Sequence, residues 1–162
     1  MTALIAANLY AGPVQAKSSP AKKSSDSIYD FYDGEIAVGI NYPGISVQYG
    51  VSPRGVLELK IQSLPGLTVI GPRYYCFLSE KVTSFNPYYG FELDAIPFSG
   101  TISRGTGYAG EAFIGVNEYL SKKIFMGVDI GPAYVYLSDL DTLEKSAGVD
   151  FVLNLSLNYV FK

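Results

Sequence analysis

The stretch that decides the fold lies near the end of the chain, where Val149–Phe161 reads VDFVLNLSLNYVF. Every second residue from Val149 is apolar, and the residues between them are mostly Asp, Asn and Ser. Because successive side chains of a β-strand point to opposite faces, this alternation predicts a strand with one apolar and one polar face.

Seven earlier segments show the same period of two, although Pro72 interrupts one of them because proline cannot donate to a strand ladder. The segments are Glu35–Tyr42, Ile45–Val51, Val56–Gln62, Leu67–Leu78, Tyr88–Ala95, Tyr108–Asn117 and Ile124–Tyr136. Strands of about ten residues suit a bilayer crossing at barrel tilt. The sequence therefore predicts an all-β fold, an eight-stranded antiparallel up-and-down transmembrane β-barrel with both termini on one side.

Composition decides which face points outward. Charged residues make up 17 % of the 162 residues, whereas a soluble exterior is about 25–35 % charged. The polar faces are rich in Gly, Ser and Asn, which suit a narrow lumen. With 12 Lys+Arg against 15 Asp+Glu, the chain also lacks the basic balance typical of a nucleic-acid partner.

Aromatic residues on the apolar faces gather near the strand ends, as in the interfacial girdles of membrane barrels. One predicted rim holds Tyr42, Tyr108, Tyr134, Tyr136 and Phe151, and the other holds Tyr49, Tyr74, Tyr89, Tyr159 and Phe161. The high β-propensity of aromatic residues is the alternative explanation of this pattern.

Three regions follow along the chain. Residues 1–16 contain an apolar run, Gly12-Pro13 and a small-residue cleavage site, which predict a signal peptide whose basic n-region is missing. Residues 17–33 begin KSSPAKKSSD, the composition of a disordered polar linker. Residues 34–162 form the predicted barrel.

The barrel region resembles the small eight-stranded outer-membrane β-barrel domains of Gram-negative bacteria, in the broad OmpA/OmpX-like group. The resemblance rests on Asn41–Gly44, Gln48–Arg54, Gly107–Gly110, Asp129–Tyr134 and Asn158–Phe161. It implies folding by the outer-membrane assembly machinery, contact with membrane lipids and lipopolysaccharide, and periplasmic termini. It also implies a C-terminal assembly signal, matched by Leu153, Leu155, Leu157, Tyr159 and Phe161, from which Lys162 departs by following the aromatic residue.

The predicted inward faces carry charged residues, which in a narrow interior must be paired, hydrogen-bonded or protonated. This predicted polar network of the lumen comprises Glu35, Glu58, Lys60, Arg73, Glu92, Asp94, Glu111, Asp129 and Asp150. We expect Arg73 to lie within hydrogen-bond reach of at least one of these acids. A structural polar plug is the favoured interpretation, and an acidic catalytic pair or a cation site is the alternative.

The chain has no His, and barrel enzymes of the outer membrane rely on His, so we expect no enzyme activity and no cofactor or metal site. Its single cysteine, Cys76, allows neither an intrachain disulfide nor a Cys-based metal site. The predicted function is a non-enzymatic outer-membrane barrel for envelope structure or surface contact. The alternatives are a secreted lipocalin-like barrel that binds an apolar ligand inside, and an adhesin acting through predicted loops 99–107 and 138–148.

Overall fold

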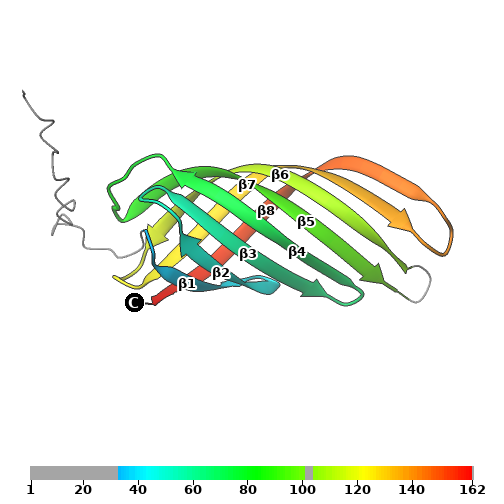
Figure 1. Cartoon of the computed structure of the whole chain (residues 1–162), viewed down its shortest axis with the longest axis horizontal. Helices are drawn as coiled ribbons and strands as arrows, with labels where there is room; N and C mark the ends of the chain where they lie inside the picture. Colours follow the sequence, from blue (N-terminus) through cyan, green and yellow to red (C-terminus); the bar gives the residue numbers. More distant parts are fainter. Residues whose placement is uncertain (1–32, 101–103, 162) are drawn as a thin grey trace, which may run out of the picture.

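The computed structural model describes residues 33–100 and 104–161, which form eight antiparallel strands in a closed ring (Figure 1). The predicted signal peptide (1–16), and the predicted linker (17–33) except for Asp33, lie outside the described residues. The strands are β1 (Ile36–Asn41), β2 (Gly44–Gly50), β3 (Gly55–Leu64), β4 (Leu67–Phe77), β5 (Phe85–Ser99), β6 (Arg104–Tyr119), β7 (Ile124–Asp139) and β8 (Lys145–Phe161). The predicted all-β, up-and-down barrel is confirmed, and β8 pairs with β1 to close it.

The faces of the strands follow the predicted alternation. Ile36, Ile130, Leu153 and Leu155 are 47, 49, 62 and 54 % exposed on the outside. Among the described residues that are buried, thirteen are polar or charged and eleven are hydrophobic. A lipocalin-like barrel would show the opposite arrangement, so the alternative of an interior site for an apolar ligand is wrong.

The strands are strongly tilted, as the register around the ring shows. Starting from Ile40, the pairs run through Ile45, Ile61, Ile70, Ala95, Tyr108 and Tyr136 to Ala147 on β8. The closing pair joins Ile40 to Leu157 instead, ten residues further along β8. Such an offset accompanies strands inclined to the barrel axis by roughly 35–45°.

The strands differ in length, which the sequence did not predict. β1 and β2 have 6 and 7 residues, whereas β5 to β8 have 15 to 17 and extend well beyond them (Figure 1). The predicted loop 138–148 is mostly strand, because Ser138 pairs with Lys145 and leaves only residues 140–144 as the turn. Predicted loop 99–107 is likewise shortened by the pair Ser99–Arg104.

Pro72 is compatible with a strand because of where it lies. It faces outward in β4 and pairs in register with Leu59 of β3, while the ladder to β5 has pairs at Ile70 and Arg73 but none at the two residues between them. Next to it, a Cβ on Gly71 would overlap the Leu93 carbonyl oxygen. Glycine therefore permits the close approach of β4 and β5 beside a residue that has no N–H.

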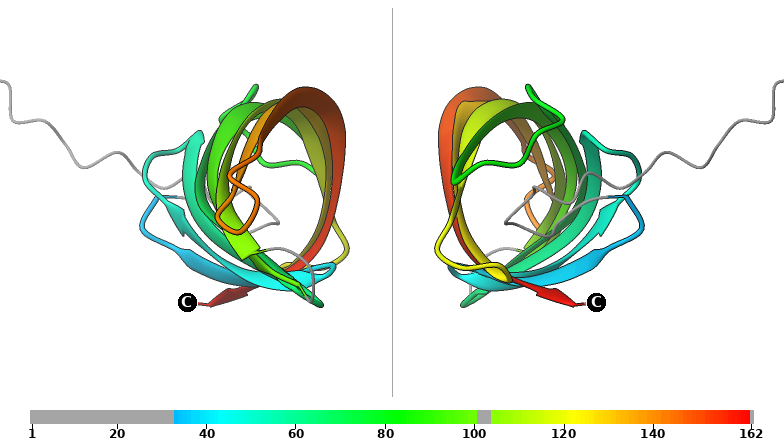
Figure 2. Two further views of the ribbon diagram at one scale, coloured as in Figure 1. Left: turned by 90° about the vertical axis from the view of Figure 1, so that its right-hand side faces the viewer. Right: turned by 90° about the vertical axis from the view of Figure 1, so that its left-hand side faces the viewer.

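The connections sort to the two ends as the sequence predicts. The turns after β2, β4 and β6 lie at the end that also holds the C-terminus, and the turns after β3, β5 and β7 lie at the opposite end (Figure 1). Figure 2 looks along the barrel from both ends and shows the strands running round a single ring. Within the described residues, no helix is long and apolar enough to span a membrane.

Candidate functional site: the charged interior

Arg73 of β4 is the centre of the charged interior. Its Nε lies 2.9 Å from Glu92 Oε2 and its Nη2 lies 2.8 Å from Asp129 Oδ2, while Nη1 is 3.7 Å from Glu58 Oε2. The Cζ atom also lies 4.1 Å from the centre of the Phe113 ring. The expectation that Arg73 reaches an interior acid is confirmed, and with it the register of β4.

Lys60 of β3 is the second buried base. Its Nζ forms an ion pair with Glu92 Oε1 at 2.6 Å and donates to Asn154 Oδ1 at 3.3 Å. Glu92 therefore receives one base on each of its two oxygens. Because its side chain is fully enclosed, this double pairing offsets the cost of removing the carboxylate from water.

Neutral side chains from other strands complete the network. Tyr88 Oη and Asn154 Nδ2 each donate to Asp129 at 2.9 Å, and Asn41 Nδ2 donates to Glu58 Oε1 at 3.3 Å. A second chain of contacts runs from Tyr75 Oη to Gln48 at 3.2 Å and from Gln48 Nε2 to Asn158 at 3.0 Å.

These Asn, Gln and Tyr residues were not among the site residues predicted from the sequence, although the alternation along each strand predicts that they point inward. Parity gives the face that a residue occupies. The choice of partner across the lumen depends on the ten-residue offset, which links residues far apart in sequence.

Glu111 of β6 differs from the other buried acids. It pairs in register with Glu92, and its side chain is 5 % exposed. Its Oε1 atom has no hydrogen-bond partner among the described residues. The buried charged set is therefore four acids, Glu58, Glu92, Glu111 and Asp129, against the two bases Lys60 and Arg73. Among the described buried residues, the acids therefore outnumber the bases by two.

The remaining predicted network residues occupy other environments. Glu35 and Asp94 are half-buried. Asp150 is exposed, contrary to its predicted place in the enclosed network, and its Oδ1 accepts from the backbone N–H of Phe151 at 2.8 Å. The reason is the short β1, which pairs with β8 only from Ser156 onward, so Asp150 has an inward parity but no neighbouring wall on one side.

Aromatic side chains close the interior toward the end that holds the C-terminus. The rings of Tyr75 and Tyr88 are 4.8 Å apart, and those of Tyr119 and Phe125 are 5.1 Å apart. Phe77 and Phe113 extend the cluster in edge contacts with Tyr88 at 6.0 and 6.2 Å. These packed rings fill the interior at that end with side chains, as expected for eight strands.

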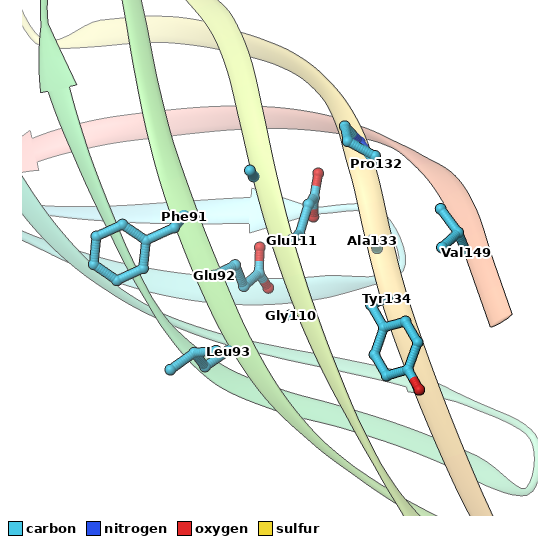
Figure 3. Close-up of a pocket in the computed structure, with 10 residues that line it drawn as sticks. Phe91, Glu92, Leu93, Gly110, Glu111, Pro132, Ala133, Tyr134 and Val149 are labelled. Carbon is cyan, nitrogen blue, oxygen red and sulfur yellow. The ribbon is translucent and has the colours of Figure 1, made fainter. Parts of the chain in front are cut away.

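A hollow of about 440 Å³ lies in the wall where β5, β6 and β7 meet (Figure 3). Its outer rim is apolar and includes Phe91, Leu93 and Tyr134, whereas Glu92 and Glu111 line its inner side. The two carboxyl groups are neighbours, but the oxygens of Glu92 are held by Lys60 and Arg73. Among the described residues, no group of three or more Asp, Glu, Cys or His is placed to hold a metal ion.

Comparisons with known proteins bear on the fold. No family model and no curated protein matches the chain. Among solved structures, the chain is similar to the crystal structure of the N-terminal β-barrel domain of Pseudomonas aeruginosa OprF, with a TM-score of 0.51 and 14 % sequence identity. The match covers 78 % of this chain and 94 % of that domain. At this identity the likeness concerns the eight-stranded barrel fold.

Proposed function

We propose that the protein is a non-enzymatic, integral outer-membrane β-barrel that serves envelope structure or surface contact. The observation that supports the proposal is the inverted distribution of side chains, apolar outside and charged inside. In water, this exterior would be a continuous apolar belt far larger than the patches that monomeric soluble proteins expose. In a bilayer, the same belt faces acyl chains.

The height of the belt agrees with a membrane. On β8, the outward residues Val149 and Tyr159 bracket ten residue steps of exposed apolar side chains. At about 3.3 Å per residue and a tilt near 45°, that stretch covers roughly 23 Å of the barrel axis. The apolar band of outer-membrane barrels is about 25 Å tall.

The proposal includes a topology and partners. The termini and the turns after β2, β4 and β6 would be periplasmic. The extended hairpins β5–β6 and β7–β8 would have their tips on the outer side of the membrane. Membrane lipids and lipopolysaccharide would surround the belt. Leu153, Leu155, Leu157, Tyr159 and Phe161 would act as the assembly signal, and all five side chains are exposed on the outer face.

The absence of enzyme activity remains part of the proposal. Its support is that both oxygens of Glu92, the acid next to Glu111 in the wall hollow, are occupied by bases. An adhesin role through the outer turns is the form that surface contact could take. The turn between β7 and β8, residues 140–144, offers the exposed apolar side chains Leu140 and Leu143 for such a contact.

Fractionation of the host cell tests the membrane location. We expect the protein in the outer-membrane fraction after washing with alkaline carbonate, and a faster gel migration of the unheated than of the boiled sample. A periplasmic protein that is bound only to the membrane surface serves as the control, because alkaline carbonate should release it. Recovery of the folded protein without detergent would contradict the proposal.

A further inference from the structure

The N-terminal part of β8 has an open edge. β1 pairs only with Ser156–Phe161, so Lys145–Leu155 pair with β7 on one side and with no strand of the described residues on the other. We call this stretch, Lys145–Leu155, the open edge. β1 and β2 stop short beside it (Figure 1), because their hairpin turns back after Asn41.

The backbone of the open edge is available for pairing. Val160 N–H donates to Lys123 O at 2.8 Å, so even-numbered residues of β8 bond to β7 and odd-numbered ones point their N–H and C=O groups the other way. The N–H of Phe151 agrees with this assignment, because it takes the side chain of Asp150 as its acceptor. The odd-numbered residues also carry the outward apolar side chains Val149, Phe151, Leu153 and Leu155. Apart from the N–H of Phe151, which donates to Asp150, these backbone groups have no strand partner among the described residues and lie in the apolar belt.

An unpaired strand edge is not stable in hydrocarbon, since each unsatisfied backbone group costs several kcal/mol there. The five residue steps of β1 rise roughly 12 Å along the axis at a tilt near 45°, which is less than half of a bilayer core. Beyond the end of β1 at Asn41, no described strand stands beside β8, and this leaves a gap in the barrel wall. The gap lies at the level of the outward residues of the open edge. This step rests on the proposed function, which places the belt in a membrane.

The charge of the lumen indicates what would fill the gap. Glu111 pairs with Ala133, and Ala133 pairs with Asp150, so these residues form one row that ends at the open edge. An inward side chain on an added strand would join this row beside Asp150 and face the buried Glu111, whose Oε1 lacks a hydrogen-bond partner among the described residues. Basic inward side chains could pair with the two acids of this row, Glu111 and Asp150.

A second copy of the chain does not fit the gap. Two copies inserted in the same sense are related by an axis along the membrane normal, which inclines their edge strands in opposite directions. With a tilt near 45° for each, the strands would cross at about 90° and could not form a ladder. We infer that the open edge binds an extended strand of another polypeptide in which basic, inward residues alternate with apolar, outward ones, by strand addition.

A synthetic peptide tests this inference on the full chain refolded in neutral detergent micelles. The probe is an eleven-residue peptide in which Leu and Lys alternate, with one Leu replaced by Trp and both ends blocked. Because the chain contains no Trp, indole emission reports on the peptide alone. We expect saturable binding with a blue shift. A peptide with Glu in place of Lys, and a peptide of the same composition without alternation, should bind at least tenfold more weakly.

Two pairs of variants assign the site. Leu153→Pro removes one N–H from the open edge but none from the β7 ladder, so peptide affinity should fall at least tenfold, whereas Leu153→Ala should stay within threefold. Glu111→Gln should weaken binding of the Lys peptide at least threefold. Glu118→Gln, an exposed acid on the same strand, should leave it unchanged. Equal binding by Leu153→Pro and the unmodified chain would overturn the inference.

Photocross-linking identifies the occupant. With benzoylphenylalanine at position 149, a cross-link to the peptide supports the inference, whereas a cross-link only to residues 1–32 of the same chain or to a second copy overturns it. Heat-dependent gel migration is measured on the same samples. A folded barrel that does not bind peptide would contradict the docking site alone, and a chain that does not fold in micelles would contradict the membrane proposal.

Discussion

At the scale of single residues, the arginine inside the barrel has the most consequences. Replacement of Arg73 by Met would leave Glu58, Glu92 and Asp129 without their shared base. Loss of one partner from a buried ionic network costs about 3–5 kcal/mol, and we expect that decrease in the free energy of unfolding. Urea titration of the refolded barrel in lipid vesicles measures it. Arg104→Met, at an exposed strand end, is the matched control and should change stability by less than about 0.5 kcal/mol.

The neighbouring carboxylates Glu92 and Glu111 should respond oppositely to neutralisation. Glu92→Gln removes the charge that pairs with Lys60 and Arg73, so the barrel should lose about 3 kcal/mol or more. Glu111→Gln removes a like charge from the position directly across the ladder, so stability should be unchanged or rise by up to about 1 kcal/mol. The same urea titration compares them. A similar loss in both variants would show that the network does not depend on the two bases.

Much of this residue-scale picture was readable from the sequence. Strand parity placed Glu58, Lys60, Arg73, Glu92, Glu111 and Asp129 inside, and the need to pair buried charges predicted the contact of Arg73 with an acid. The prediction for Asp150 was wrong because strand parity gives the face on which a residue lies, but not whether a neighbouring strand is present to enclose it. The pairs across the lumen were not predictable, because they depend on how far the register climbs around the ring.

At the scale of elements, β8 tests which face meets lipid. Leu153 is outward and exposed in the middle of the apolar stretch of β8. Leu153→Arg should therefore cost about 2–4 kcal/mol in vesicles, as expected for a basic residue near the bilayer midplane. Leu143→Arg, in the turn before β8, is the control and should cost less than about 1 kcal/mol. An equal cost at both positions would place Leu153 outside the hydrocarbon.

The strand lengths were the element-scale feature that the sequence did not provide. Ser99–Gly107 and Ser138–Gly148 are rich in Gly, Ser and charged residues, which are typical of loops. They extend the strands because each arm of the hairpin has the other arm as a partner, as in Ser99–Arg104 and Ser138–Lys145. The composition of a segment indicates only whether that segment by itself favours a loop or a strand. A strand ladder also depends on the second segment that pairs with it.

At the scale of the whole molecule, the uneven wall should make stability depend on bilayer thickness. The β1–β2 hairpin has 6- and 7-residue strands and matches only a thin hydrocarbon layer. We expect a higher free energy of unfolding in dilauroyl than in dioleoyl phosphatidylcholine vesicles, measured at equilibrium by urea titration. Equal stability in both lipids would show that the short hairpin does not limit the fit of the barrel.

The ten-residue offset between Ala147 and Leu157 around the ring has a consequence for insertions and deletions. Because the offset is even, the inward residues of β8 still pair with inward residues of β1 where the ring closes. One residue added within a strand would make the count odd, and either a bulge must absorb it or half of the strand must turn its apolar side chains into the lumen. Two residues added at the tip of a hairpin, one on each arm, leave the count unchanged. Variation among barrels of this type should therefore proceed in paired steps at the hairpin ends, which makes the short β1–β2 hairpin the place where the wall can be lengthened.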